Sequence, residues 1–167
     1  MNIEVLNNIL SKERTILEKC WSNITAYPKV KIWKKCNKSK GQCFVTSMHL
    51  IRFIEKEIKE GIAFINRGIV KSIDGAIIIN DHCWIEIHSD LYCEPLIIDI
   101  TVDQSKKVNK KVLLNFKNQI TIKYKVNYIT NKVYSQYDLQ NLDENTKMRY
   151  LSLTSKYNNF ILNRQHD

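Results

Sequence analysis

Apolar residues recur at helical spacing in two segments of the first third of the chain. The first segment, residues 2–20, places them on one face at Ile3, Leu6, Leu10, Ile16 and Leu17. The second begins at Cys43 and continues with Phe44, Met48, Ile51, Ile54 and Ile58. Because residues three and four positions apart share one side of a helix, both segments are predicted to be amphipathic helices. Gly41 permits a tight turn into the second helix, and Gly61 marks its end.

The middle of the chain has shorter apolar runs that are typical of strands. Residues 62–70 form the first run, and the turn at residues 72–75 contains the hairpin signal Asp-Gly. The next strand region covers residues 76–79 and, after two polar residues, residues 82–88. A further strand is predicted at residues 96–101.

The last third of the chain is predicted to add both types of element. Residues 119–128 alternate β-branched and aromatic residues with lysines, which predicts a strand. Asp143 is placed to start a final helix through about Tyr157, and the tail from Asn158 is expected to fray.

The order of these elements predicts one α+β domain over residues 1–167, because the chain has no internal repeat or flexible linker. Its parts are an N-terminal helix and basic loop (1–39), a core (40–104), and further strands with a C-terminal helix (105–167). In this fold the helix that begins at Cys43 packs on an antiparallel sheet.

Three residues in the predicted core carry candidate chemistry. Cys43 stands in the first turn of a helix, where the positive end of the helix dipole favours a thiolate. His82 lies on a strand, and strand alternation places Trp84 on the same face and Cys83 on the other. Asp99 interrupts an apolar strand, where an unpaired carboxylate is strongly unfavourable, so it must have partners. A thiol, an imidazole and an orienting carboxylate together are the groups needed for nucleophilic attack on an acyl carbon.

The order helix Cys, strand His, strand Asp resembles the papain-like and transglutaminase-like cysteine enzymes, which include proteases, amidases, deamidases and acyl transferases. The match is closer to a phage and bacterial group of that superfamily, with Gly-polar-Cys, then His-x-Trp, then Asp-x-Thr-x-Asp-Gln. The corresponding segments here are Gly41-Gln42-Cys43, His82-Cys83-Trp84 and Asp99-Ile100-Thr101-Val102-Asp103-Gln104. The similarity spans residues 40–104, and residues 146–149 show a weaker similarity to the same group.

The resemblance implies a papain-like or transglutaminase-like core with Cys43 as nucleophile, His82 as base and Asp99 as the orienting acid. Gln42, Trp84 and Gln104 are candidate oxyanion or cleft residues. Papain's oxyanion glutamine lies several residues before its cysteine, whereas Gln42 is adjacent, so the backbone N–H of Cys43 is the better donor. The implied reaction is hydrolysis or acyl transfer at an amide of a protein or peptide, without a cofactor, and the subtype stays open.

The charge of the chain suggests a class of partner. Lys and Arg number 26 against 17 acidic residues, for a net charge of +9, and much of the excess lies in residues 29–40 and 106–125. Because residues 29–40 lead directly to Cys43, their field would attract an acidic partner. A solvated lysine-rich surface explains the same charge equally well. Trp33 alone is interleaved in the first stretch, so nucleic-acid binding has weak support.

The N-terminal residues lack the apolar core of a signal peptide, and no apolar run reaches membrane-spanning length. A cytoplasmic protein with no membrane span and with reduced cysteines is therefore expected. Delivery into another cell or host is left open.

Three alternatives to an enzyme stay open. Zinc binding is considered because several cysteines and histidines are close in sequence, but the chain has no Cys-x-x-Cys pair and no His-Glu-x-x-His motif. A basic nucleic-acid-binding module would explain the charge and leave the Cys, His, Asp order a coincidence. A non-catalytic member of the same fold would bind a partner instead.

Overall fold

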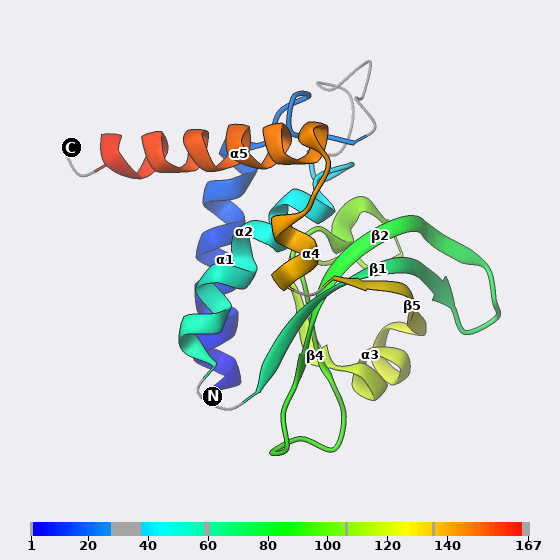
Figure 1. Ribbon diagram of the computed structural model, residues 1–167. Coiled ribbons are helices and arrows are strands. Elements are labelled where there is room, and N and C mark those ends of the chain that lie inside the picture. Colours follow the sequence, from blue (N-terminus) through cyan, green and yellow to red (C-terminus); the bar gives the residue numbers. More distant parts are fainter. Residues whose placement is uncertain (1, 28–37, 59–60, 106, 135, 165–167) are drawn as a thin grey trace.

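The computed structural model describes residues 2–27, 38–58, 61–105, 107–134 and 136–164. Within them, five strands form one antiparallel sheet in the order β4-β3-β2-β1-β5 (Figure 1). The strands are β1 (Ile62–Ser72), β2 (Ile77–His88), β3 (Leu96–Asp99), β4 (Leu113–Phe116) and β5 (Val126–Tyr134). The helices are α1 (Ile3–Cys20), α2 (Cys43–Glu57), α3 (Lys117–Tyr124), α4 (Gln136–Gln140) and α5 (Glu144–Asn163). The fold is α+β, as the sequence predicts.

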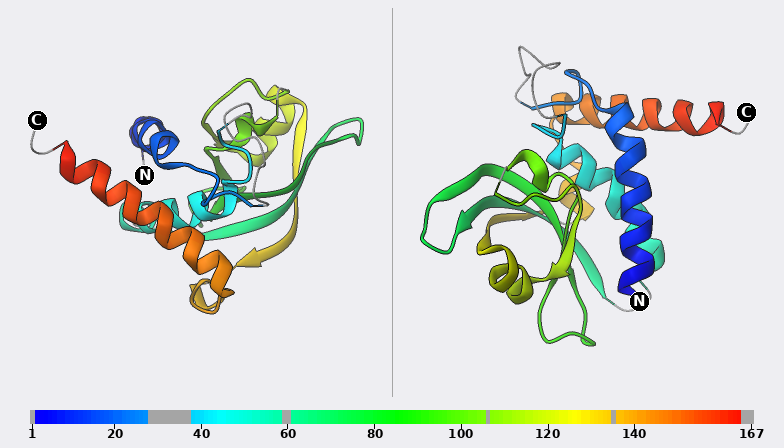
Figure 2. Two further views of the ribbon diagram at one scale, coloured as in Figure 1. Left: turned by 90° about the horizontal axis from the view of Figure 1, so that it is seen from above. Right: turned by 180° about the vertical axis from the view of Figure 1, so that it is seen from behind.

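The sheet separates two apolar clusters. On one face, α1, α2 and α5 pack against Ile65, Ile85 and Ile98 (Figure 2). On the other face, Trp84 and Ile97 pack with residues that include Ile120 of α3. Neighbouring residues of β2 therefore enter different clusters, which confirms the strand alternation predicted from Trp84 onward.

The predicted strand at residues 119–128 is wrong. Most of this segment is α3, which ends at Tyr124. Lys125 caps the helix with a left-handed φ of 56°, and β5 starts only at Val126. The reason lies in the topology, because β4 and β5 are at opposite edges of the sheet. A hairpin cannot join opposite edges, so the chain crosses the sheet as a helix. Ile120 is buried on this crossing, whereas Ile122 is 61% exposed.

Two boundaries also differ from the predictions. The regions 76–79 and 82–88 form one strand, β2, with a left-handed residue at Asp81 in place of a break. The final helix continues to Asn163, so the fraying expected from Asn158 is wrong. Asp143 is the N-cap of this helix, and its carboxylate accepts a hydrogen bond from the N–H of Thr146 at 3.0 Å.

Arg14 connects α1 to the segment that follows β3. Its guanidinium is buried, donates to the backbone oxygen of Ile100, and pairs with Asp103 at 2.8 Å (Nη2 to Oδ2). The same guanidinium lies 4.5 Å from the centre of the Trp21 ring. These contacts hold the turn after β3 against the helical layer, next to the start of α2. No helix among the described residues is long and apolar enough to span a membrane.

Candidate active site

The site is built around the first turn of α2. Gly41, two residues before the helix, has a left-handed φ of 74°, and its carbonyl accepts a hydrogen bond from the N–H of Tyr27 at 2.9 Å. A Cβ atom at this position would lie 2.7 Å from the backbone oxygen of Tyr27. Glycine is therefore required here both for its backbone angle and for space. This turn delivers Cys43 as the first residue of α2, nine-tenths buried.

The start of α2 meets β2 where β3 ends. β3 pairs with β2 only across residues 85–87, so the part of β2 that contains His82 and Cys83 has no strand partner on that side in the described chain. The Oε1 atom of Gln104, in the short helix η2 (Val102–Gln104), accepts from the N–H of Gly41 at 3.4 Å. This contact places the entry to α2 at the open side of β2.

His82 and Asp99 form a buried pair. The Nε2 atom of His82 lies 2.6 Å from Oδ2 of Asp99, and both side chains are almost fully buried. The Asp99 carboxylate also accepts from the N–H of Thr101 at 2.9 Å, from its hydroxyl at 3.1 Å, and from the hydroxyl of Tyr128 at 2.8 Å. Asp99 thus has the partners that a charged group in an apolar strand needs.

Nδ1 of His82 is the ring nitrogen that remains for the Cys43 thiol. It is buried and has no hydrogen-bond partner of standard geometry among the described residues. The thiol and the ring are nevertheless near enough to shift each other's pKa. Since Nε2 is held by Asp99, this interaction falls on Nδ1. A long thiol–imidazole contact is usual in the absence of substrate.

The pKa shifts favour a thiolate and an imidazolium. The Cys83 thiol, as a hydrogen-bonding neighbour, lowers the pKa of Cys43 most, and the hydrogen bond and charge of His82 lower it further. Burial opposes these effects, but the pKa stays well below its usual value. Burial alone would lower the pKa of His82, but the charge and hydrogen bond of Asp99, with a contribution from Cys43, raise it to about 10. Burial likewise opposes the lowered pKa of Asp99, and it is outweighed by the His82 charge together with the hydrogen bonds from His82, Thr101 and Tyr128. An ion pair of this kind activates a cysteine nucleophile.

Cys83 is the contact that the sequence analysis missed. By strand alternation the Cys83 side chain faces away from that of His82. Both side chains nevertheless interact with Cys43, because the Cys43 thiol lies beside the edge of β2 that β3 leaves unpaired. The hydrogen bond with Cys43, then burial, raise the pKa of Cys83 well above its usual value. The opposite shifts favour the thiolate at Cys43 and the protonated thiol at Cys83.

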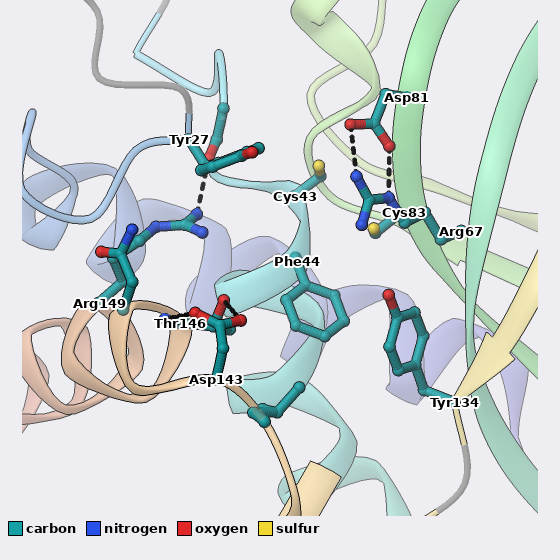
Figure 3. Close-up of a pocket in the computed structure, with 13 residues that line it drawn as sticks. Tyr27, Cys43, Phe44, Arg67, Asp81, Cys83, Tyr134, Asp143, Thr146 and Arg149 are labelled. Carbon is teal, nitrogen blue, oxygen red and sulfur yellow. Dashed lines mark hydrogen bonds and ion pairs between the residues drawn. The ribbon is translucent and has the colours of Figure 1, made fainter. Parts of the chain in front are cut away.

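A cavity of about 310 Å³ opens over the two sulfur atoms (Figure 3). The rings of Phe44 and Tyr134 form one side of it, 4.8 Å apart between centroids. The start of α5 and the segment before it form another, including Asp143, Thr146 and Arg149. The complete lining is Tyr27, Gly41, Cys43, Phe44, Arg67, Asp81, Cys83, Tyr134, Leu142, Asp143, Asn145, Thr146 and Arg149.

Two arginines line the cavity, and each has partners. Arg67 forms a two-point pair with Asp81, at 2.5 Å and 2.7 Å. Arg149 donates to the carbonyl of Thr25 at 3.2 Å and to that of Gly41 at 3.3 Å. With two arginines and two aspartates, the charges of the lining balance. The acidic partner predicted from residues 29–40 stays a prediction, since most of that stretch lies outside the described residues.

Three residues predicted for the oxyanion site or cleft lie outside this lining. Gln42 is fully buried and donates from Nε2 to the carbonyl of Ser22 at 3.0 Å, so its amide points away from the thiol. Trp84 is a core residue, bonded through Nε1 to Glu86 at 2.9 Å. Gln104 supports Gly41 instead of lining the cavity. The structure thus places these three outside the cavity lining, and their expected oxyanion or cleft roles stay predictions.

Some neighbours of the cavity and of Asp99 were not predicted, and among them Thr146 and Arg149 had a sequence signal. Arg149 falls in the segment of weaker similarity at residues 146–149, and both Thr146 and Arg149 line the cavity. Tyr128 had no signal, because its contact with Asp99 joins strands that are not adjacent in the sheet. Among the described residues, no group of three His, Cys, Asp or Glu side chains is placed to hold a metal ion. Cys36 lies outside the described residues.

Comparison with known proteins places the chain in a family. No curated protein and no solved structure matches it. The family model described as "YunG protein" matches residues 10–159, which include all three residues of the Cys43, His82 and Asp99 constellation. On this match over most of its length, the chain belongs to the YunG family.

Proposed function

We propose that this protein is a cysteine-dependent hydrolase or acyl transferase of the papain-like or transglutaminase-like type, with Cys43, His82 and Asp99 as its triad. The observation that carries the proposal is the buried His82–Asp99 pair, 2.6 Å apart, next to the Cys43 thiol on the wall of a cavity. The lowered pKa of Cys43 and the raised pKa of His82 favour a thiolate and an imidazolium, which are the protonation states that such a reaction needs.

The proposed reaction begins with attack of the Cys43 thiolate on an acyl carbon in the cavity. The backbone N–H of Cys43 is a donor for the developing oxyanion, because the first N–H groups of a helix have no partner within it. The His82 imidazolium gives its proton to the leaving amine, and a thioester remains on Cys43. Neutral His82 then takes a proton from water, for hydrolysis, or from an amine, for acyl transfer. Asp99 holds the ring orientation and stabilises its cation.

An active ester tests this reaction without knowledge of the natural substrate. We expect p-nitrophenyl acetate to acetylate Cys43 with a burst of p-nitrophenol, and peptide mass spectrometry to locate one acetyl group on that residue. The Cys43→Ala variant should lose the burst, and His82→Ala should slow it by about a hundredfold, the lower end of the range for a lost general acid–base group.

Cys93→Ser is the matched control, because Cys93 is an exposed thiol away from the cavity. Its burst should equal that of the parent protein. Acetyl groups spread equally over several cysteines, or a burst unchanged in a folded His82→Ala protein, would count against the triad.

A further inference from the structure

Cys43 and Cys83 form a pair of neighbouring thiols in one cavity, and the proposed reaction does not require the second of them. Both thiols line the same cavity, and they lie near enough to shift each other's pKa. Figure 3 shows the two sulfur atoms at the same end of this cavity, close to the Arg67 side chain. A triad needs one nucleophile, so the second thiol calls for an explanation of its own.

We infer that the pair is a reversible oxidation site, at which hydrogen peroxide oxidises Cys43 and Cys83 then closes an intramolecular disulfide with it. The inference goes beyond the proposed function and does not depend on it. It requires a reactive thiolate, a second thiol near it and entry of a small oxidant.

The first step is attack by the thiolate on peroxide. The Cys43 sulfur forms an S–O bond while the O–O bond breaks, and the departing hydroxide takes a proton to become water. Sulfur is oxidised by two electrons to the sulfenic acid, and peroxide is reduced. Thiolate character and access govern this step. Cys43 meets both conditions, because it lines the cavity and its lowered pKa favours the thiolate.

In the second step Cys83 acts as the resolving thiol. Its sulfur attacks the Cys43 sulfur, the S–S bond forms as the S–O bond breaks, and the leaving hydroxide departs as water with the proton of the Cys83 thiol. The sum is two thiols and one peroxide giving one disulfide and two waters. Without a neighbouring thiol, a sulfenic acid goes on to irreversible forms. The geometry supplies that neighbour.

The electrostatics also order the two steps. While Cys43 is a thiolate, its hydrogen bond and negative charge raise the pKa of Cys83 and keep it protonated. A sulfenic acid is neutral, so the first oxidation removes that charge. Cys83 then ionises more readily, at the moment when its thiolate is required.

The other described cysteines are less suited to react. Cys20 is buried in α1, and burial raises its pKa. Cys93 is exposed, but it lies outside the lining of the cavity that contains Cys43 and Cys83. Peroxide should therefore act selectively on Cys43 and Cys83.

The test treats fully reduced protein with one equivalent of hydrogen peroxide, in a background with Cys36→Ser and Cys93→Ser. Free thiols are blocked with iodoacetamide and peptides are mapped without reduction. We expect the loss of two thiols per chain, a cross-linked peptide that joins Cys43 to Cys83, and full reversal by dithiothreitol. Recovery of an alkylated Cys83 beside an irreversibly oxidised Cys43 would overturn the inference, as would a disulfide that involves Cys20.

Variants separate the resolving role from general thiol reactivity. In Cys83→Ala, dimedone should trap a sulfenic acid on Cys43, and longer exposure should oxidise that residue irreversibly. The matched control Cys20→Ala should still form the disulfide. If Cys83→Ala does not fold, the peptide map of the parent background decides by itself. None of these readouts uses acyl transfer, so failure here is distinguishable from failure of the proposed function.

Discussion

The carboxylate of Asp99 accepts four hydrogen bonds inside a strand whose other side chains are apolar. Two of the donors, His82 and Tyr128, share the single oxygen Oδ2. The carboxylate thus has two tasks at once, because it keeps His82 charged and is itself kept charged by its neighbours. The reactivity of Cys43 should depend on this residue although Asp99 does not reach the thiol.

We expect Asp99→Asn to reduce alkylation of Cys43 by iodoacetamide near neutral pH. Asparagine does not stabilise the imidazolium, so the pKa of His82 falls and that of Cys43 rises toward the free value of about 8.5. The rate should fall about tenfold for each pH unit by which the thiol pKa exceeds the assay pH. Alkylation measured from pH 5 to 9, with the modified peptide identified by mass spectrometry, gives the shift.

Tyr128→Phe is the graded comparison. It removes one hydrogen bond from Asp99 and keeps the ring that packs against Trp84 at 5.0 Å between centroids. The pH profile of Cys43 should move in the same direction as in Asp99→Asn, but less. A variant that melts earlier while its folded fraction keeps the parent profile would assign Asp99 a purely structural role.

At the scale of elements, the site depends on an irregularity between β1 and its neighbours. The pairing of β1 with β5 shifts between Arg67 and Gly68, and that of β1 with β2 shifts just after the pair of Gly68 with His82. Asp81, the residue before His82, has a φ of 56° and is held by Arg67. These register shifts form a β-bulge, and the bulge therefore sets the direction in which the His82 side chain points from β2.

Gly68→Ala should destabilise the protein and disturb the site together. A Cβ atom at Gly68 would lie 1.9 Å from the backbone oxygen of Ile129, so β1 and β5 must separate locally. Forcing a methyl group into packed surroundings costs about 1–3 kcal/mol. Cys43 alkylation should slow because Tyr128 lies on β5, which moves, and His82 is the β2 residue paired with Gly68. Thermal melts and alkylation rates measure the two effects.

Gly75→Ala is the control for this change. Gly75, unlike Gly68, is left-handed, with a φ of 90°, and a Cβ atom there meets nothing within 4 Å. Its cost should be about 1–2 kcal/mol of backbone strain, with Cys43 alkylation unchanged. Equal losses of thiol reactivity in both variants would contradict a specific role for the bulge.

At the scale of the whole molecule, His49 links the stability of the helical layer to pH. Its ring is buried between Phe53 and Tyr157, at centroid distances of 5.1 Å and 4.3 Å. Burial, with the nearby charge of Arg52, lowers its pKa to about 4 from 6.5. The contact joins α2 to α5, so protonation of this ring would weaken the packing of the layer that carries Cys43.

We expect stability to fall as the pH drops from about 6.5 to about 4. In this range the unfolded chain binds a proton at His49 that the folded protein does not, and below pH 4 the effect levels off. The difference in pKa corresponds to on the order of 3 kcal/mol. His49→Leu should flatten the dependence, measured as the midpoint of denaturant unfolding against pH. Parallel curves for the parent and variant proteins would refute the assignment.

The sequence alone determined the elements whose signals are local. Helical spacing predicted α1, α2 and the start of α5, and the Asp-Gly turn predicted the β1–β2 hairpin. It also identified Cys43, His82 and Asp99, since a cysteine at a helix start and an aspartate in an apolar strand are unusual in themselves. Each of these signals is contained within a few consecutive residues, so it can be read without knowledge of contacts between distant segments.

Only the tertiary structure decided what depends on contacts between distant segments. It made residues 117–124 a helix, because the chain must cross from one edge of the sheet to the other. It brought Tyr128 to Asp99, and it brought Cys83 as well as His82 to Cys43, because β3 ends where α2 begins. Strand alternation describes a side chain relative to its own sheet, whereas the direction from which a helix approaches is set by the packing of the whole chain.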